Sequence, residues 1–187
     1  MKRIASVILT GALILSMGAA AFAATPSKTV ADEIKAVAAV ETTGFDRVSI
    51  STEETEATVA QSAKVVAELA SSTEELKEAV GATAEEKVEI TAVQTVTIEQ
   101  TPLFNRTEAT VSLSSAVIDA AYKENEQVTV LVMIPVVGKD GTVTYEKIAV
   151  TGVVKDGKVQ VKLTGAQLKK IGKKSVTLVA TKKTAKV

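Results

Sequence analysis

The chain has 187 residues, with 22 acidic and 22 basic side chains and no cysteine, histidine or tryptophan. Without histidine or cysteine, the sequence excludes Ser-His-Asp triads, thiol nucleophiles, disulfides and zinc sites built from those residues. Aromatic residues make up only 3% of the chain, so its core must consist of Val, Ile, Leu and Ala.

The first 23 residues have the three parts of a secretory signal peptide. Lys2 and Arg3 give a positive start, residues 4–15 are an apolar run, and Ala21-Phe22-Ala23 presents the small residues that a signal peptidase recognises. We therefore expect cleavage after Ala23, a secreted, extracellular protein, and no transmembrane span in the mature chain. An uncleaved apolar anchor is the alternative.

Residues 24–86 are predicted to form a helical or mixed segment. Apolar residues at helical spacing predict a helix over 29–40, although the β-branched residues within 37–40 suit the start of a strand equally well. Alternation over 47–50 then predicts a brief strand.

Two helices are predicted to follow, each opened by a capping box in which two side chains bond to each other's backbone N–H. Ser51 and Glu54 form the first box, and Ser72 and Glu75 form the second. Gly81 has the place of a glycine that ends the second helix. The first helix is expected to bury residues spaced three and four apart, namely Val59, Ala63, Val66, Leu69 and Ala70.

Residues 87–187 are predicted to form an antiparallel β-sandwich-like domain, which makes the fold class α+β. Its first strand begins at Lys87, with apolar residues on one face and Glu and Thr on the other, which is expected to face solvent. Pro102 interrupts this strand, because proline donates no hydrogen bond to a ladder. The chain then continues to a last strand over 175–181.

The clearest part of this domain is a three-stranded meander over 127–163. Asp-Gly pairs at Asp140 and Asp156 tolerate the positive φ of tight turns, and so they predict its two hairpins. In the second strand the apolar parity changes between Tyr145 and Ile148. A one-residue slip would reconcile the two parts, which predicts a β-bulge at Glu146-Lys147.

Charge divides the chain into unlike halves. Residues 24–101 hold 6 basic and 15 acidic side chains, whereas residues 102–187 hold 14 basic and 7 acidic ones. Such asymmetry indicates either a partner of one sign or attraction between the two halves.

Lysines near the end of the chain are the candidate contact for a polyanion: Lys169, Lys170, Lys173, Lys174, Lys182 and Lys183. They would hold an anionic cell-wall polymer, a membrane surface or another surface protein by salt-sensitive contacts. The alternative role is solubility and protection of an edge strand. Nucleic acid is not expected as a partner, because no aromatic residues alternate with these lysines.

Paired carboxylates are the main remaining route to catalysis, as in glycosidases. The acidic clusters fall in first helical turns or on a polar strand face, where carboxylates are normally solvated. We therefore expect no enzyme, no cofactor and no metal site, but a non-enzymatic binding or adhesion module. A self-associating structural protein is the second hypothesis, and a carboxylate-based hydrolase is the third.

Several short stretches resemble secreted, uncharacterised proteins of Gram-positive anaerobes. They are the signal ending at Ala21-Phe22-Ala23, the stretch from Thr25 to Asp32, the stretch from Glu75 to Thr83, and a Val-rich terminal β domain. The resemblance implies a signal peptide, a helical segment and a C-terminal β domain. It implies no activity and no site residues.

Overall fold

The structure is a computed structural model that describes residues 34–44 and 47–185. The expected signal peptide over 1–23 and most of the first predicted helix lie outside the described residues. Within them, residues 37–40 belong to a strand, so the β-branched alternative for this stretch is confirmed and a helix extending to Val40 is wrong.

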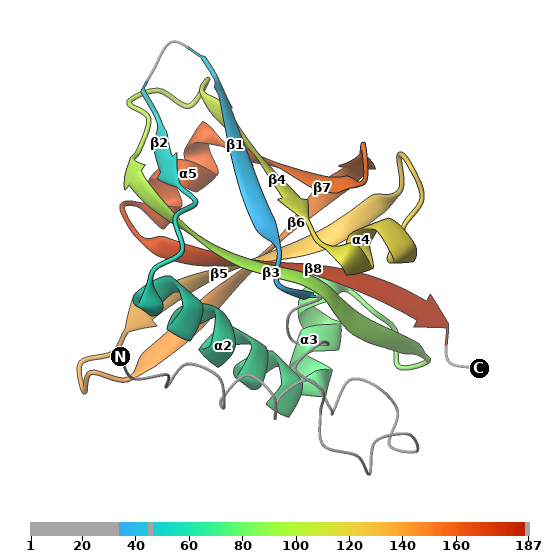
Figure 1. The fold of residues 1–187 in the computed structure, drawn as a ribbon. Coiled ribbons are helices and arrows are strands. Elements are labelled where there is room, and N and C mark those ends of the chain that lie inside the picture. The colour runs from blue at the N-terminus through green and yellow to red at the C-terminus, as the bar shows by residue number, and fades with distance from the viewer. Residues whose placement is uncertain (1–33, 45–46, 186–187) are drawn as a thin grey trace, which may run out of the picture.

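One eight-stranded sheet forms the body of the protein, in the order β1-β4-β7-β6-β5-β8-β3-β2 (Figure 1). Every pairing between these strands is antiparallel. The strands are β1 (Val37–Thr43), β2 (Ser49–Ser51), β3 (Glu86–Gln100), β4 (Glu108–Ser114), β5 (Gln127–Val137), β6 (Val143–Lys155), β7 (Lys158–Thr164) and β8 (Ser175–Ala185).

The sheet curls until it is nearly closed. Just before β1, Lys35 forms a parallel bridge with Val93 of β3, and the Ala36 N–H donates to the Val93 carbonyl at 3.0 Å. Since β2 also pairs with β3, the first two strands share a sheet with the C-terminal strands. The structure is therefore α+β, with one mainly antiparallel sheet and a few helices.

Four helices accompany the sheet in the described residues: α2 (Glu56–Ser71), α3 (Thr73–Val80), α4 (Ala116–Ala121) and α5 (Gly165–Ile171). The longer two, α2 and α3, cover the convex face of the sheet, whereas α4 and α5 lie at opposite ends of the curl (Figure 1). Ile118 of α4 and Leu168 and Ile171 of α5 enter the core inside the curl. The short helices thus close the two ends of that core.

Both faces of the central strands are covered, which explains why two parities of β6 are apolar. Ile148 and Val150 pack on the core inside the curl, whereas Tyr145 packs on the layer beneath the helices. The β5–β6 register runs without a shift from Gln127↔Val153 to Val137↔Val143. The predicted bulge at Glu146-Lys147 is therefore wrong, because the change of parity marks a change of buried face. The meander itself is confirmed.

A bulge does occur in β3, where the register shifts between Ile90 and Ala92. It turns Ile90 toward the helices and Ala92 toward the core inside the curl. Beyond it, the face expected to be solvated is buried under α2, and Thr95 is almost inaccessible. The expectation of a polar solvent face on this strand is wrong there, because a helix with hydroxyl side chains covers it.

The helix ends differ in part from the predicted capping boxes. Helix α2 is capped by Thr55, whose hydroxyl accepts from the Thr58 N–H, while Ser51 lies in β2. Ser72 is the N-cap residue of α3 but makes no side-chain cap bond. Gly81 ends α3 with φ +64°, as the sequence predicts.

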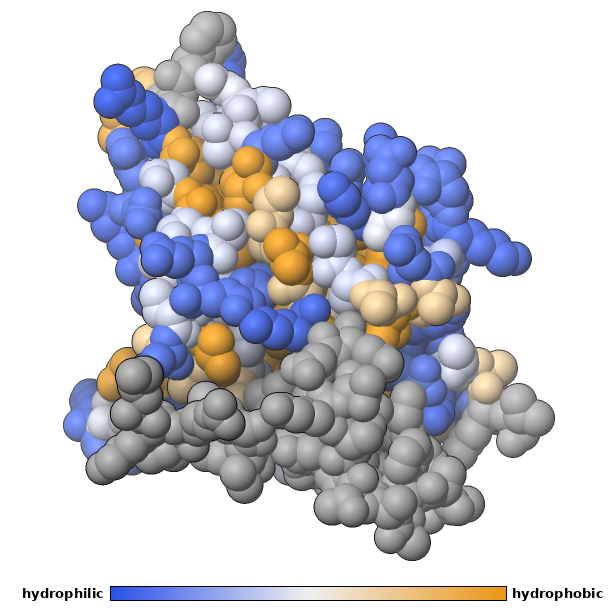
Figure 2. Space-filling view, viewed as in Figure 1, coloured by the Kyte–Doolittle hydropathy of each residue, from blue (hydrophilic) through white to orange (hydrophobic). Residues whose placement is uncertain are grey.

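The core inside the curl approaches the surface where β1 and β2 leave β3. Figure 2 shows hydrophobic side chains over these two strands. The partly buried residues that pack on the core there are Val40, Val48 and Ile50. The core inside the curl is therefore only partly covered at this place (Figure 2).

Candidate functional site

Three segments protrude at one end of the sheet, which we call the α5 end. They are the β3–β4 loop (101–107), the β5–β6 turn (138–142), and α5 with the turn after it (165–174). They follow the same ends of the strands, because β3 and β5 end where β8 begins, with pairs Thr97↔Ser175 and Met133↔Thr177. In Figure 1 the β3–β4 loop and α5 lie at the upper left, and the β5–β6 turn lies at the lower left.

The α5 end carries four of the six lysines that the sequence singled out. A capping box starts α5: the Gln167 N–H donates to the Thr164 hydroxyl at 3.3 Å, and the Thr164 N–H donates to Gln167 Oε1 at 2.8 Å. With Leu168 and Ile171 in the core, the lysines between them face outward. The exposed set is Lys169, Lys170, Lys173 and Lys174.

Two of these four lysines contact the base of the β5–β6 hairpin. Lys170 pairs with Glu146 of β6 at 2.5 Å, and the Lys174 ammonium donates to the Pro135 carbonyl of β5 at 3.4 Å. Residues 165–175 hold no acidic side chain, so Glu146 offsets only part of their charge. The result is a local positive potential on a helix that is fixed by its cap and its buried face.

The other two lysines lie at the opposite end of the sheet, which we call the α4 end; it comprises α4 with the residues after it (116–126) and the β6–β7 turn (155–158). From Lys174 to Lys182 the chain runs along β8, a separation of about 26 Å at a strand's rise per residue. Lys182 donates to the Ala121 carbonyl at the end of α4, and its ammonium lies 5.2 Å from the centroid of the Tyr122 ring. A cation there stabilises both a helix C-terminus and an aromatic face. Lys183 lies 3.5 Å from the Gly81 carbonyl.

The position of β8 also bears on the alternative role of these lysines. Strand β8 lies between β5 and β3, so it is an inner strand of the sheet. Its pairing with β5 covers only Thr177–Thr181, however, so Lys182 and Lys183 pair with β3 alone and have one open edge. Protection of that edge therefore stays a prediction for these two lysines.

Tyr122 is the most perturbed titratable group beside this α4 end. Burial raises its pKa to about 12, against the opposing effect of the hydrogen bond with Thr91 at 2.8 Å. Thr91 is the bulged residue of β3, and its hydroxyl also reaches the Ala180 carbonyl at 3.1 Å. The cluster joins α4, β3 and β8, which is a structural role.

Apolar side chains at the α5 end are functional candidates that the sequence did not reveal. Leu103 and Phe104 of the β3–β4 loop are 78% and 66% exposed, and Val137 at the end of β5 is 68% exposed. Val136 and Val143 beside it are 41% and 44% exposed. The valines continue an alternating pattern that indicates buried strand, so only the place where neighbouring strands end shows that they are exposed.

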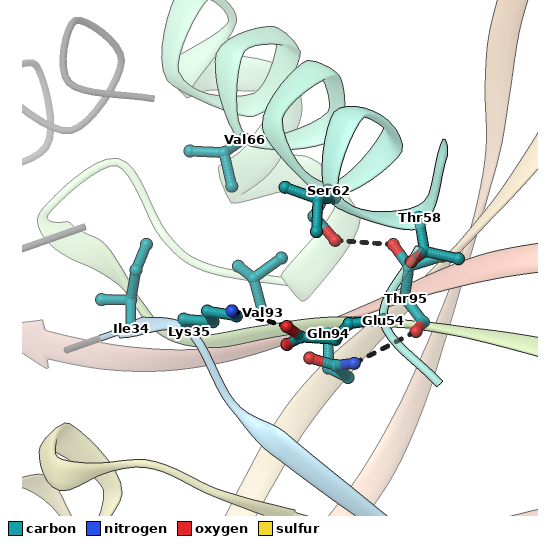
Figure 3. A pocket seen from close by; sticks show the side chains of 10 residues that line it. Ile34, Lys35, Glu54, Thr58, Ser62, Val66, Val93, Gln94 and Thr95 are labelled. Carbon is teal, nitrogen blue, oxygen red and sulfur yellow. Dashed lines mark hydrogen bonds and ion pairs between the residues drawn. The ribbon is translucent and has the colours of Figure 1, made fainter. Parts of the chain in front are cut away.

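A second candidate is a hollow of about 50 Å³ that is open to solvent between α2 and β3 (Figure 3). Ile34, Val66 and Val93 line it, and an ion pair of Lys35 with Glu54 at 2.7 Å lies at its edge. Its hydroxyl groups bond within the protein, as Ser62 does with Thr95 at 2.6 Å. The hollow thus presents no spare polar group that would orient a ligand, and we assign it no function.

The acidic clusters do not form a buried pair. No Asp or Glu in the described residues is buried, and no three of them come together there as a metal site would require. Some carboxylates are ion-paired instead: Lys147 of the basic half contacts Glu75 at 2.7 Å and Glu68 at 3.8 Å. Part of the charge asymmetry is therefore neutralised within the protein, by ion pairs that join β6 to α2 and α3.

Comparison with protein-family models, curated proteins and solved structures found no match to this chain. Among the described helices, none has the length and apolar character needed to cross a membrane. The α5 end therefore has to be interpreted from its own chemistry.

Proposed function

We propose that the protein is a secreted, non-enzymatic binding module that holds to an anionic extracellular surface through the lysines of its α5 end. The observation that carries this proposal is the exposure of four lysines on one capped helix and its following turn, without an acidic residue in the same segment. Cleavage after Ala23, and a sandwich-like arrangement in which the two halves of the curled sheet face each other, are parts of the same proposal.

Electrostatics alone would give such attachment a recognisable behaviour. Each lysine near an anionic surface contributes about 1 kcal/mol at moderate ionic strength, and the effect decays within a Debye length of ~10 Å at 0.1 M salt. Lys169, Lys173 and Lys174 form no ion pair among the described residues, so they are the most available of the four. Binding should be salt-sensitive and should tolerate variation in the polymer.

The test measures retention on beads that carry inorganic polyphosphate. The variant Lys169→Gln/Lys173→Gln/Lys174→Gln removes three charges and leaves the Lys170–Glu146 pair intact. The matched control Lys123→Gln/Lys155→Gln/Lys158→Gln removes three exposed charges from the α4 end.

We expect the wild type and the control to bind at low salt and to elute as salt rises, and the α5-end variant to bind roughly 100-fold more weakly. Equal retention of all three proteins would overturn the proposal. Equal loss in the two variants would overturn it as well, because net charge rather than the α5 end would then govern binding.

Self-association is the second candidate, because the helical layer of one copy is acidic where the α5 end of another is basic. Exposed acids of this layer include Glu56, Glu74 and Glu78. Sedimentation velocity at low salt decides this case: a monomer over a wide concentration range excludes it, whereas dimers that dissociate with salt favour it over surface binding.

A further inference from the structure

Exposed apolar residues are concentrated at the same end of the molecule as the lysines. Of the seven large hydrophobic residues that are exposed in the described residues, two lie in the β3–β4 loop of the α5 end and three flank its β5–β6 turn. The other two, Val37 and Val59, lie on β1 and α2. Val37 pairs with Ser114 just before α4, so in the described residues the α4 end carries one such residue beside its exposed lysines. In the described residues, several exposed apolar groups therefore gather beside positive charge only at the α5 end.

The β5–β6 hairpin projects beyond the rest of the sheet. Pairing of β5 with β8 stops at Met133↔Thr177, whereas β5 and β6 stay paired as far as Val137↔Val143. The four residues beyond Met133 therefore extend as a two-stranded ribbon for about 13 Å. Lys174 contacts the base of this ribbon at Pro135, so a positive charge lies beside the exposed valines.

The β3–β4 loop is held against the other side of α5. A Cβ added to Gly165, the first residue of α5, would lie 2.9 Å from the backbone of Asn105, so loop and helix are in direct contact. Pro102 is buried and anchors the start of the loop. Leu103 and Phe104 thus project next to the lysine-bearing helix, with exposed Arg106 just after them.

We infer that the α5 end docks on an anionic lipid bilayer, with the loop and hairpin tips entering the interface while the lysines of α5 contact the headgroups. This inference rests on the proposed function, since it names the surface that those lysines hold. Interfacial binding needs apolar side chains for the acyl boundary and basic ones for the headgroups, and this end has both.

Other occupants explain the apolar residues less well. A hydrophilic polyanion would contact the lysines but leave Leu103, Phe104 and the valines in water. A second copy of the chain needs an interface of ~1,000 Å² or more, and a few partly exposed side chains on separate protrusions fall short of that. One side chain opposes docking: Asp140 at the hairpin tip accepts bonds from the Thr142 hydroxyl at 2.7 Å and N–H at 3.0 Å, so it stays charged.

The experiment measures co-flotation of the purified protein with vesicles of phosphatidylglycerol and phosphatidylcholine, and with vesicles of phosphatidylcholine alone. Val137→Thr/Val143→Thr keeps side-chain shape and strand preference while removing apolar surface. Leu103→Ser/Phe104→Ser removes the apolar surface of the loop tip. Val37→Thr/Val59→Thr is the matched control, because it alters exposed valines away from the α5 end. Circular dichroism confirms that each variant is folded.

We expect binding to the anionic vesicles only, about tenfold weaker binding for the hairpin pair and a larger loss for the loop pair, with the control unchanged. Asp140→Asn should bind more tightly than the wild type. The loop and hairpin variants should bind polyphosphate beads as the wild type does. The α5-end lysine variant should lose binding to both the beads and the anionic vesicles.

Each contrary result has a distinct meaning. Retention on polyphosphate without vesicle binding overturns the bilayer inference and leaves the proposed function standing, and loss of both overturns both. Equal binding to neutral vesicles, or wild-type binding by the loop and hairpin variants, also overturns the inference. The inference is also overturned if the protein binds no vesicles but forms dimers in sedimentation, and the hairpin variant abolishes those dimers. A second copy of the chain would then be the partner.

Discussion

Replacing Thr95 with valine tests whether hydroxyl groups hold α2 on the sheet. The Thr95 hydroxyl lies 2.6 Å from the Ser62 hydroxyl of α2 and 2.8 Å from the Thr177 hydroxyl of β8. Thr95 and Thr177 are almost inaccessible to water. A further bond runs from Gln61 Nε2 to the Thr177 hydroxyl at 3.3 Å. The three hydroxyls therefore form a short chain between helix and sheet.

The expected loss of stability follows from this chain. Thr95→Val removes two hydrogen bonds worth about 1 kcal/mol each, and it leaves the Thr177 hydroxyl with a weaker set of partners. The new methyl group recovers part of the loss, because the site is already apolar on its other sides. We expect the free energy of unfolding to fall by about 2 kcal/mol, measured by urea denaturation followed by far-ultraviolet circular dichroism.

A triple variant separates this explanation from simple packing. Ser62→Ala/Thr95→Val/Thr177→Val removes all three hydroxyls that bond to one another, so that none of them is left without its partner. Because replacing all partners by apolar groups is often nearly neutral, the triple variant should be no less stable than Thr95→Val alone. The reasoning would be refuted if Thr95→Val lowered the free energy of unfolding by less than about 0.5 kcal/mol, the worth of one weak hydrogen bond. It would also be refuted if the loss in the triple variant equalled the sum of the losses in the three single variants.

Three further outcomes are expected. Tyr122 is neutral in the fold until its pKa of about 12 but ionises earlier when unfolded, so stability should fall as pH rises from 10 to 12. Tyr122→Phe should reduce that fall and remove one of two tyrosinate absorbance steps, while Tyr145, whose pKa burial also raises, keeps the rest; an unchanged profile would contradict this. Gly165→Ala should destabilise by about 1–2 kcal/mol in urea, because the new Cβ meets the Asn105 backbone; a neutral result would mean that loop and helix separate freely. Leu69→Ala, in the fully buried layer under α2, should cost about 3 kcal/mol, and a shift below 1 kcal/mol would mean that α2 packs loosely.

The meander could be predicted because its signals are local. Asp156 and Gly157 both have positive φ, at 51° and 68°, as the Asp-Gly pair requires. The burial of Thr95 could not be predicted in the same way, because threonine suits a solvated strand face as well as a polar contact with a helix. Its partner Thr177 lies 82 residues away, and no local pattern records that pairing.

The candidate site could likewise be predicted only where its features depend on local sequence. Lys169 and Lys170 lie outward on a helix whose cap and buried residues are visible in sequence, so their exposure follows from local pattern. Lys182 was grouped with them by proximity in the chain, yet an extended strand carries it to the other end of the molecule. The exposure of Val137 depends on where β8 begins relative to β5, which is a property of the assembled sheet.

The near closure of the sheet also determines how its rims are shielded from other chains. The rim strands are β1 and β2, with sequences VAAVETT and SIS, and neither contains lysine or proline. Strand β2 pairs with β3, and Lys35 just before β1 bridges Val93 of the same strand, so both rim strands approach the same margin of β3. The curvature thus leaves less open edge for strand addition by another chain, a protection that open sheets obtain from charged edge residues.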